Sequence, residues 1–369
     1  MKKFFFYFSS TLVLFLILNL FLSIILSPIT KFITINILNK PVYKEESLKA
    51  IGIDRKDEGI FYNETWNRSY KYVQFAEHYE SETQSGKYVN VTKNNGRKVV
   101  NQTNCKKNFY FYGSSLTFGY NVKDTQTIPA YFKEILDINY SKLNYCVYNF
   151  GSASYFSTQE NILFQSHILH NKISEGDFIF FIDGDSENGN QQNKISLHLK
   201  KLFDGVNSRM LNEVKFSSLI LWESLPTTKI YNIFKRIFIK NKNSQNPIKE
   251  IKNKELKNKE IKEVFQKNIL IREAICKNLM LRCFTFLQPF PSIHGFYDNK
   301  LFKERAFNQL DLDKYNLLKN TKHIFDISNS LDGNMLHSFV DNNHYSPGSN
   351  KLIAKSIYDI ANKKIDEYR

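Results

Sequence analysis

Two segments far apart in the chain carry the residue types that nucleophilic catalysis requires. The first, NFYFYGSSLTFGY at residues 108–120, places Ser115 directly after an aromatic run and the small residues Gly113 and Ser114. A serine hydroxyl becomes a useful nucleophile only when a base accepts its proton, and the base is usually a histidine that a carboxylate orients. Ser115 is therefore a candidate nucleophile. The alternative is that this segment is only a tight strand-to-helix turn.

The second segment supplies a candidate base and its partner. In FVDNNHYSPGSNKLIA, residues 339–354, Asp341 precedes His344 by three residues, immediately before a predicted helix. A carboxylate at this spacing can reach an imidazole nitrogen and orient it. The alternative is that Asp341 caps a local turn beside an exposed His344. Other histidines lack such a partner in the sequence and are interpreted as ordinary helix or loop residues: His167, His170, His294 and His337.

An alternation of strands and helices begins near residue 108 and positions both segments. Strands are predicted at residues 109–112, 146–151, 177–184, 217–224, 283–289 and 323–328, and helices at residues 127–136, 157–169 and 346–365. The strand at 177–184 is apolar almost throughout, as strands covered on both faces are. This alternation predicts an α/β domain in which helices cover a parallel sheet.

Glycines stand at the carboxyl ends of three of the predicted strands: Gly113, Gly151 and Gly184. The carboxyl ends of parallel strands meet at one edge of the sheet, where ligands bind. We therefore expect Ser115 to lie in a crevice that the loops after three strands share.

Two further segments stand out beside this pattern, one before the main domain and one inside it. Residues 30–104 form a polar lead-in region, rich in aromatic residues, that is expected to wrap onto the main domain at 105–369. Within it, the alternating residues 87–91 and the turn signal at residues 94–96 predict a β-hairpin. Residues 239–266 form a lysine-rich insert in the main domain, predicted to be a charged helix or a mobile segment.

The N-terminus predicts a membrane anchor. Lys2 and Lys3 precede an uncharged run at residues 4–29, and a helix of about 24 residues spans about 36 Å, enough to cross a bilayer. A secretory signal peptide is the alternative, but its apolar part is shorter and ends in small residues. We expect an uncleaved transmembrane helix at residues 1–29 with a cytoplasmic N-terminus. The rest would then be exported, periplasmic or extracellular, as in a single-pass protein of a bacterial inner membrane.

The basic composition does not indicate nucleic-acid binding. The formal net charge is +15, but many lysines fall in residues 240–264, and no basic motif interleaved with aromatic residues accompanies them.

The sequence contains no CxxC motif, so a cysteine-ligated zinc site is not expected. An exported compartment permits disulfides. A helix running through Cys276 and Cys283 would hold them about 10 Å apart, too far to bridge. The pairing of Cys105, Cys146, Cys276 and Cys283 is therefore left open, with buried free thiols as the simplest alternative.

Taken together, four ordered segments resemble the GDSL/SGNH hydrolase superfamily. They are YGSSLTFGYNVKDTQTIPAYF at residues 112–132, VYNFGSASYFSTQENILF at 147–164, FFIDGDSEN at 180–188 and VDNNHYSPGSNKLIA at 340–354. The resemblance implies a three-layer α/β/α sandwich with a flavodoxin-like parallel sheet and a Ser-His-Asp esterase or acyl-transfer site. By motif, Ser115 would be the nucleophile, His344 the base and Asp341 its orienting partner.

The sequence departs from this family pattern around the oxyanion hole. Ser154 stands where the family has a glycine that donates a backbone N–H, and Ser186 stands where it has an asparagine. The N–H survives the first change if serine tolerates the local backbone. Losing a donor outright costs about 10²–10³ in rate. Asn188, two residues further on, is a candidate replacement donor.

These features predict a membrane-anchored, exported serine esterase that acts on acyl esters, acetyl esters in the first place. The expected substrate is an acylated small molecule or glycan, with acetylated envelope polysaccharide among the candidates. One alternative is an O-acyltransferase that uses the same residues to acylate a polysaccharide. Another is a non-catalytic carbohydrate-binding or scaffold protein on a decayed hydrolase fold. The mechanism requires neither a metal nor a cofactor.

Overall fold

The computed structural model describes most of the predicted catalytic domain. The described residues are 2–32, 43–73, 76–80, 84–92, 96–100, 102, 105–141, 143–170, 172–187, 222, 225–228, 247–294, 309–332 and 338–367. The chain forms two compact units, one of residues 1–42 with 196–252 and one of residues 43–195 with 253–369. All the candidate site residues fall in the second unit, which also contains the lead-in region from Tyr43 onward.

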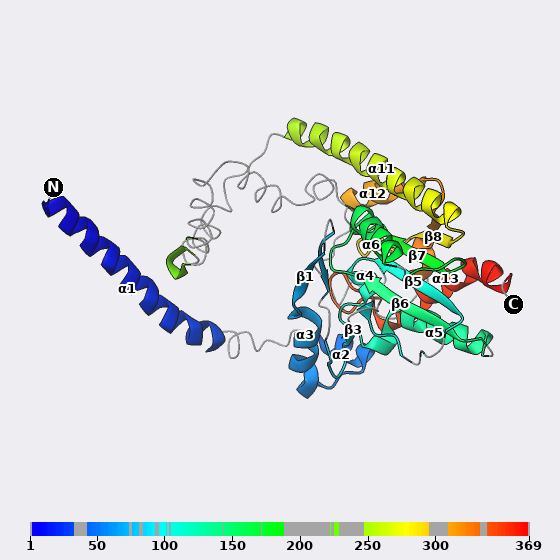
Figure 1. Cartoon of the computed structure of the whole chain (residues 1–369), viewed down its shortest axis with the longest axis horizontal. Coiled ribbons are helices and arrows are strands. Elements are labelled where there is room, and N and C mark those ends of the chain that lie inside the picture. Colours follow the sequence, from blue (N-terminus) through cyan, green and yellow to red (C-terminus); the bar gives the residue numbers. More distant parts are fainter. Residues whose placement is uncertain are drawn as a thin grey trace. The chain divides into compact units, whose positions relative to one another are not determined.

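A seven-stranded sheet forms the centre of the second unit (Figure 1). Its strands are β3 (Val91–Thr92), β4 (Gly96–Arg97), β5 (Lys107–Gly113), β6 (Tyr145–Gly151), β7 (Phe178–Asp183), β8 (Arg282–Leu287) and β9 (Phe325–Asp326). The spatial order is β3-β4-β6-β5-β7-β8-β9. All neighbouring pairs are parallel except β3 and β4. If β5 to β9 are counted as 1 to 5, the order 2-1-3-4-5 is that of flavodoxin-like sheets.

This order fixes the place where a ligand is expected. From β5 the chain continues to β6 on one side and then to β7 on the other. The connection after β5 thus runs to one side, to β6, and the connection after β7 runs to the other, to β8. A crevice opens between the carboxyl ends of β5 and β7 where the two connections diverge. Ser115 follows β5 after a single residue, Ser114. The sequence-based prediction of a parallel α/β sheet is confirmed.

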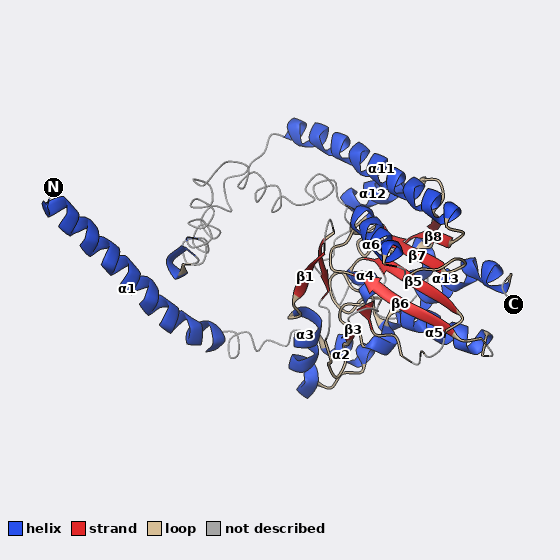
Figure 2. Ribbon diagram, in the orientation of Figure 1, coloured by secondary structure: helices blue, strands red, loops and turns tan. Residues whose placement is uncertain are grey.

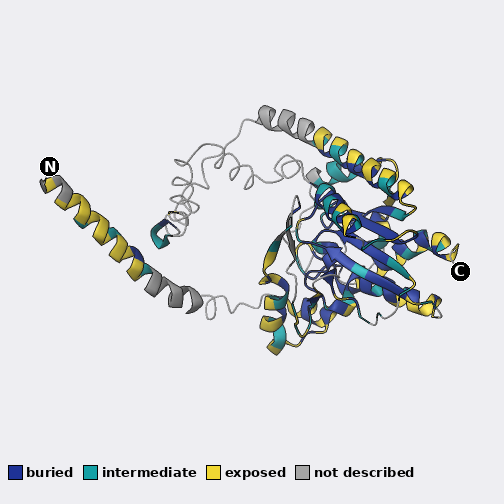
Figure 3. Cartoon of the chain, in the orientation of Figure 1, coloured by how far each residue is buried: buried dark blue, intermediate teal, exposed yellow. Residues whose placement is uncertain are grey.

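Helices cover both faces of the sheet (Figure 2). They are α5 (Ile128–Asn139) and α13 (Pro347–Asp366) on one face and α6 (Ser157–Leu169) on the other, with the end of α11 (Pro247–Asn278) beside α6. Alternate residues of β5 separate the two layers. Phe109 and Phe111 pack with Phe132 of α5, whereas Tyr110 and Tyr112 belong to the cluster of α6. The central strands are consequently buried on both faces (Figure 3).

The covering helices begin where the sequence offers caps. The Thr127 hydroxyl accepts the N–H of Ala130 at 3.2 Å and starts α5. The Ser346 hydroxyl accepts the N–H of Ser349 at 3.2 Å and starts α13. In each helix a proline stands in the first turn, where its missing N–H costs nothing. The start of α13 fixes the chain just after His344.

The lead-in region packs beside the carboxyl end of β5. It contains α2 (Glu45–Ile51), the 3₁₀ turn η2 (Arg55–Asp57), α3 (Glu58–Trp66), β1 (Tyr70–Val73) and β2 (Glu77–Glu80). Its buried residues Tyr43 and Phe61 share a core cluster with Phe118 and Tyr120 from the segment after β5. The predicted hairpin is confirmed as the antiparallel pair β3 and β4, which extends the sheet through β6.

Three further predictions concern the N-terminal segment, the lysine-rich insert and the strand at 217–224, and their outcomes differ. Residues 2–32 form the helix α1 (Lys2–Phe32), but in the part of the chain that the structure describes, no helix has both the length and the apolar character of a membrane span. The transmembrane helix expected at residues 1–29 is therefore unsupported by the structure. The lysine-rich insert contributes to the long charged helix α11 from residue 247 onward. The strand expected at 217–224 lies outside the described residues except for Trp222.

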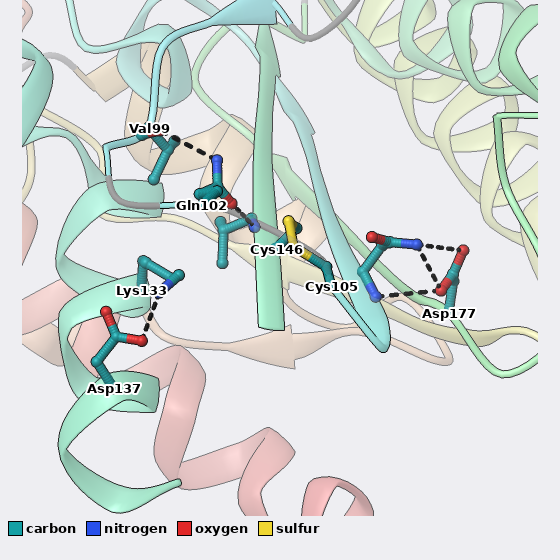
Figure 4. The surroundings of a disulfide bond; sticks show 9 residues. Val99, Gln102, Cys105, Lys133, Asp137, Cys146 and Asp177 are labelled. Carbon is teal, nitrogen blue, oxygen red and sulfur yellow. Dashed lines mark hydrogen bonds and ion pairs between the residues drawn. A yellow bond between two sulfur atoms is a disulfide. The ribbon is translucent and has the colours of Figure 1, made fainter. Parts of the chain in front are cut away.

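All four cysteines are paired, so the alternative of free thiols is wrong. Cys105 bonds to Cys146 and ties the start of β5 to β6 (Figure 4). Cys276 bonds to Cys283 across a Cα–Cα distance of 6.1 Å. The assumption of one continuous helix fails here because α11 ends at Asn278 and Met280, at φ 52°, reverses the chain into β8.

Polar contacts reinforce the region of the first disulfide. The N–H and the side-chain amide of Asn108 in β5 both donate to the Asp177 carboxylate (Figure 4). The Gln102 side chain donates to the Val99 carbonyl at 3.1 Å and accepts the N–H of Val147 in β6. The segment that leads into β5 is therefore tied to β6, and the start of β5 is tied to the residue that precedes β7.

Candidate active site

Ser115 is the first residue of α4 (Ser115–Phe118), which begins immediately beyond β5. The Ser114 hydroxyl caps this short helix by accepting the N–H of Leu116 at 3.3 Å. Ser115 is partly exposed, whereas residues 109–114 and 116–122 are all buried. The turn therefore presents one serine of the pair to the crevice and uses the other to hold the backbone.

Two glycines let α4 sit directly on the strand ends. A Cβ at Gly113 would lie 2.1 Å from the hydroxyl oxygen of Thr117, and a Cβ at Gly151 would lie 2.2 Å from the backbone nitrogen of Phe118. Both separations are far below van der Waals contact. No residue with a side chain fits at either strand end unless α4, and Ser115 with it, moves.

Asn149, in β6, fastens the other end of α4. Its side-chain amide donates to the carbonyls of Thr117 and Phe118 at 3.0 and 3.2 Å. Its side-chain oxygen accepts the N–H of Gly151 at 3.1 Å. The side chain is fully buried, so these bonds satisfy carbonyls at the C-terminus of α4 that would otherwise lack partners.

The structure brings Ser115, His344 and Asp341 into one hydrogen-bonded chain. His344 Nε2 lies 3.1 Å from Ser115 Oγ, and His344 Nδ1 lies 2.7 Å from Asp341 Oδ2. An ionised carboxylate only accepts, so Nδ1 carries the proton of a neutral imidazole and Nε2 is free to accept the Ser115 proton. This is the arrangement of a nucleophile, a base and its orienting group.

Asp341 also caps its own loop. Its Oδ1 accepts the N–H groups of Asn343 and His344, each at 2.7 Å. The alternative considered from the sequence, a turn-capping aspartate, is thus correct for Asp341, but His344 is only 6 % exposed. One carboxylate both shapes the loop and orients the imidazole.

The charge state of Asp341 suits this role. Burial alone would raise the pKa of Asp341. The charge and the hydrogen bond of His344 lower it, as do the backbone N–H groups of Asn343 and His344. As a result the pKa of Asp341 lies below its ordinary value. The carboxylate therefore stays ionised and can stabilise an imidazolium that forms when His344 takes a proton.

Aromatic rings enclose His344. The Tyr120 ring stacks on the imidazole with centroids 5.4 Å apart, and the Trp66 ring meets it edge to face at 5.5 Å. The Tyr120 hydroxyl lies 2.7 Å from that of Tyr70. Trp66 and Tyr70 come from the lead-in region, so this region forms part of the wall around the candidate base.

The candidate oxyanion residues lie on the loops after the strands that flank β5. Ser154 follows β6 and is exposed, with φ 58°. A serine has thus adopted the left-handed backbone that favours glycine, which explains how it replaces one. Ser186 follows β7 and is partly exposed, and Asn188 lies outside the described residues. Among the hydrogen bonds of the described residues, those of Ser115, His344 and Asp341 include neither Ser154 nor Ser186.

A buried charged cluster, which the sequence analysis missed, anchors the loop after β7. The Arg272 guanidinium, from α11, bonds to Asp183 at the end of β7 and to Glu160 of α6 at 3.1 Å. Glu187 accepts the N–H and hydroxyl of Ser157 at 2.6 and 3.1 Å. Arg272 lies 89 residues from Asp183, and no local pattern connects the two. The cluster fixes both ends of the segment that carries Ser186.

This cluster buries more carboxyl groups than cations. Burial and the neighbouring Asp183 raise the pKa of Glu187 to about 7, although Ser157 and Arg272 oppose the shift. The same two causes, burial first, hold the pKa of Glu160 well above its ordinary value. Burial therefore disfavours the charged form of Glu160, and the closer of the two ion pairs of Arg272 is the one with Asp183.

Comparisons with known proteins find only distant likenesses. No family model matches the chain, and no curated protein matches it. LAE5, an alpha/beta hydrolase enzyme from the metagenome of Lake Arreo, Spain, matches at 9 % identity and a TM-score of 0.37, over 70 % of this chain and 95 % of its own.

Two further solved structures match in the same range. The acetylxylan esterase Axe2 from Geobacillus stearothermophilus matches at 11 % identity and a TM-score of 0.35, over 70 % of this chain and 95 % of its own. A lipolytic protein of the G-D-S-L family from Desulfitobacterium hafniense matches at 11 % identity and a TM-score of 0.36, over 69 % of this chain and 99 % of its own. Likeness of this degree carries no information about activity.

The close approach of α4 to β6 predicts the effect of a single methyl group. Gly151→Ala should lower the free energy of unfolding by about 1–3 kcal/mol, as overpacking does, because its Cβ would lie 2.2 Å from the Phe118 nitrogen. Urea denaturation measures the change. The control is Gly59→Ala at an exposed position of α3, where an added Cβ meets no neighbouring atom within 4 Å, and it should be neutral or stabilising by up to about 1 kcal/mol. Equal effects of the two variants would contradict this account of the turn.

The Glu187 carboxyl predicts a pH dependence of stability. Its pKa is about 7 in the folded protein against 4.5 for an ordinary glutamate, so the folded state holds a proton that the unfolded chain releases. The resulting stabilisation is complete below pH 4.5 and is lost as the pH rises through 7.

Glu187→Gln should therefore lose less stability than the wild type between pH 5 and pH 8, by up to about 3 kcal/mol. Denaturation at both pH values measures the difference. The exposed loop variant Glu175→Gln is the control and should reproduce the wild-type pH dependence. A Glu187→Gln variant that loses as much stability as the wild type would show that Glu187 does not titrate in this range.

Proposed function

We propose that this chain is a serine ester hydrolase that removes acyl groups, acetyl groups in the first place, through an acyl-enzyme intermediate. The observation that carries the proposal is the hydrogen-bonded chain from Ser115 Oγ through His344 to Asp341, with separations of 3.1 and 2.7 Å. It stands at the carboxyl end of β5, where the strand order reverses. This is where doubly wound sheets bind their ligands.

The geometry supports a two-step reaction. Ser115 Oγ attacks the ester carbonyl carbon as its proton passes to His344 Nε2, and Asp341 stabilises the resulting imidazolium. When the tetrahedral intermediate collapses, the bond to the alcohol oxygen breaks and His344 returns the proton to that alcohol. His344 then takes a proton from water, which attacks acyl-Ser115, and the second collapse returns the proton to Ser115 and releases the carboxylic acid.

The negative oxygen of each tetrahedral intermediate needs donors near Ser115. We propose the backbone N–H of Ser154 and the Ser186 hydroxyl for this role, with Asn188 as a third candidate. Ser154 has the backbone conformation of a glycine, which supports the first assignment. The buried ion pair and the Glu187–Ser157 bonds hold the loop of Ser186, which supports the second.

The acceptor of the acyl group distinguishes the two catalytic proposals. In a polysaccharide O-acyltransferase, a sugar hydroxyl takes the place of water in the second step. One observation favours this alternative: His344 is 6 % exposed, between the rings of Tyr120 and Trp66, and a base shielded in this way has limited access to free water. A non-catalytic binding protein is the remaining alternative, and it predicts that Ser115 has no chemical role.

Turnover of a small activated acetyl ester by the full-length protein tests the proposed hydrolase. Ser115→Ala should lower kcat/KM by at least about 10³-fold, because the nucleophile is lost. Ser114→Ala removes only the cap of α4 and should cost about 1 kcal/mol of stability while keeping kcat/KM within about tenfold of the wild type. Equal rates for the wild type and Ser115→Ala would contradict the proposal.

We also propose that this catalytic domain is exported and anchored to the membrane by its N-terminal segment. The two disulfides of the described residues support export, because such bonds persist in oxidising compartments. The anchor rests on the sequence alone, on Lys2, Lys3 and the uncharged residues 4–29.

A C-terminal alkaline phosphatase fusion tests the location, since this reporter requires disulfides that form outside the cytoplasm. The full-length fusion produced in a bacterium should be active and should stay with the membranes during alkaline carbonate extraction. Deletion of residues 1–29 should abolish the reporter activity. An active fusion that carbonate releases would indicate a cleaved signal peptide, and an inactive full-length fusion would contradict export.

A further inference from the structure

The Asp341 carboxylate has a fourth partner that the proposed mechanism does not use. The side-chain amide nitrogen of Asn121 donates to Asp341 Oδ2, the same oxygen that accepts from His344 Nδ1. Asn121 is 1 % exposed and lies in the turn after α4, with φ 60°. It lies 220 residues from Asp341 in the sequence.

Two residues of the lead-in region hold Asn121 from the other side. Its side-chain oxygen accepts the Tyr43 hydroxyl at 2.5 Å and the Trp66 indole N–H at 2.7 Å. Burial raises the pKa of Tyr43 above its ordinary value, so its hydroxyl keeps the proton that it donates. Both polar ends of the amide are thus engaged, one by the lead-in region and one by Asp341.

The indole N–H fixes the direction of the amide. An indole nitrogen only donates, whereas a tyrosine hydroxyl can also accept. If the amide were reversed, its NH₂ group would face the Trp66 donor and its oxygen would face the Asp341 carboxylate, so both contacts would be repulsive. The contact with Trp66 therefore selects the orientation in which Asn121 donates to Asp341.

We propose that Asn121 is a positioning residue of the active site and that Trp66, with Tyr43, sets its direction. The amide holds Asp341 Oδ2 against His344 Nδ1, so the lead-in region takes part in catalysis through the path Trp66, Asn121, Asp341, His344, Ser115. This inference rests on the proposed function, because it requires Ser115 to react. It assigns to residues before the sheet a role beyond covering the core.

The rate at which a fluorophosphonate labels Ser115, followed over pH in the full-length protein, tests this inference without requiring water as an acceptor. Asn121→Gly suits the test because glycine adopts φ 60° without strain. We expect it to slow labelling about tenfold or more. We also expect the acid limb of the profile to move to higher pH, since a carboxylate that loses a donor stabilises the neighbouring imidazolium more strongly.

Two further variants, Trp66→Phe and Tyr43→Phe, test how much each partner of Asn121 contributes to the labelling rate. Trp66→Phe keeps a ring against His344 but removes the N–H that selects the amide direction, so its labelling should be slowed as well. Tyr43→Phe leaves the Trp66 donor in place and should have the smallest effect of the three. Thermal unfolding of each variant shows whether the rates follow the loss of folded protein.

The outcomes separate this inference from the proposed function. Wild-type labelling at Ser115 with an unchanged rate and pH profile in Asn121→Gly would overturn the positioning role alone. A lower rate with an unmoved acid limb, in proportion to lost folded protein, would overturn it too, because it would show a merely structural residue. A wild-type protein that is not labelled at Ser115 would overturn the proposed function and the inference with it.

Discussion

The hydrogen bonds to one carboxylate, that of Asp341, join the parts of this molecule that catalysis would require. Its two oxygens accept from the N–H groups of Asn343 and His344, from the imidazole of His344 and from the amide of Asn121. These donors come from the loop before α13 and from the turn after α4. An ionised group with this many donors keeps its charge, and each donor removes a direction in which the side chain could turn.

The position of Ser115 depends on a second constraint, the absence of side chains at the ends of β5 and β6. Gly113 and Gly151 let α4 rest on the sheet, and Asn149 then fastens it through the carbonyls of Thr117 and Phe118. The loop after β7 is held differently, by the buried Arg272–Asp183 pair. Close packing and an amide thus hold α4, and an ion pair holds the loop after β7, which preorganises the crevice around the serine.

Much of this could be predicted from the sequence because the signals are local. Apolar runs that end in glycine gave the strands β5, β6 and β7, and the three-residue spacing of Asp341 and His344 gave their contact. The contacts of Asn121 with Tyr43 and Trp66 span 78 and 55 residues, and no periodicity reports such pairs. The disulfide between Cys276 and Cys283 was missed because the chain reverses at Met280. A left-handed methionine has no signal in the sequence.

The central claim is that Ser115 becomes acylated, and trapping the intermediate tests it most directly. The full-length protein would be mixed with an activated acetyl ester, quenched in acid within seconds and digested for peptide mass spectrometry. The account predicts one acetyl group on the peptide that contains Ser115 and none on this peptide in His344→Ala, whose base is missing. Acetyl groups only on other residues, or equal acetylation of Ser115 in His344→Ala, would contradict it.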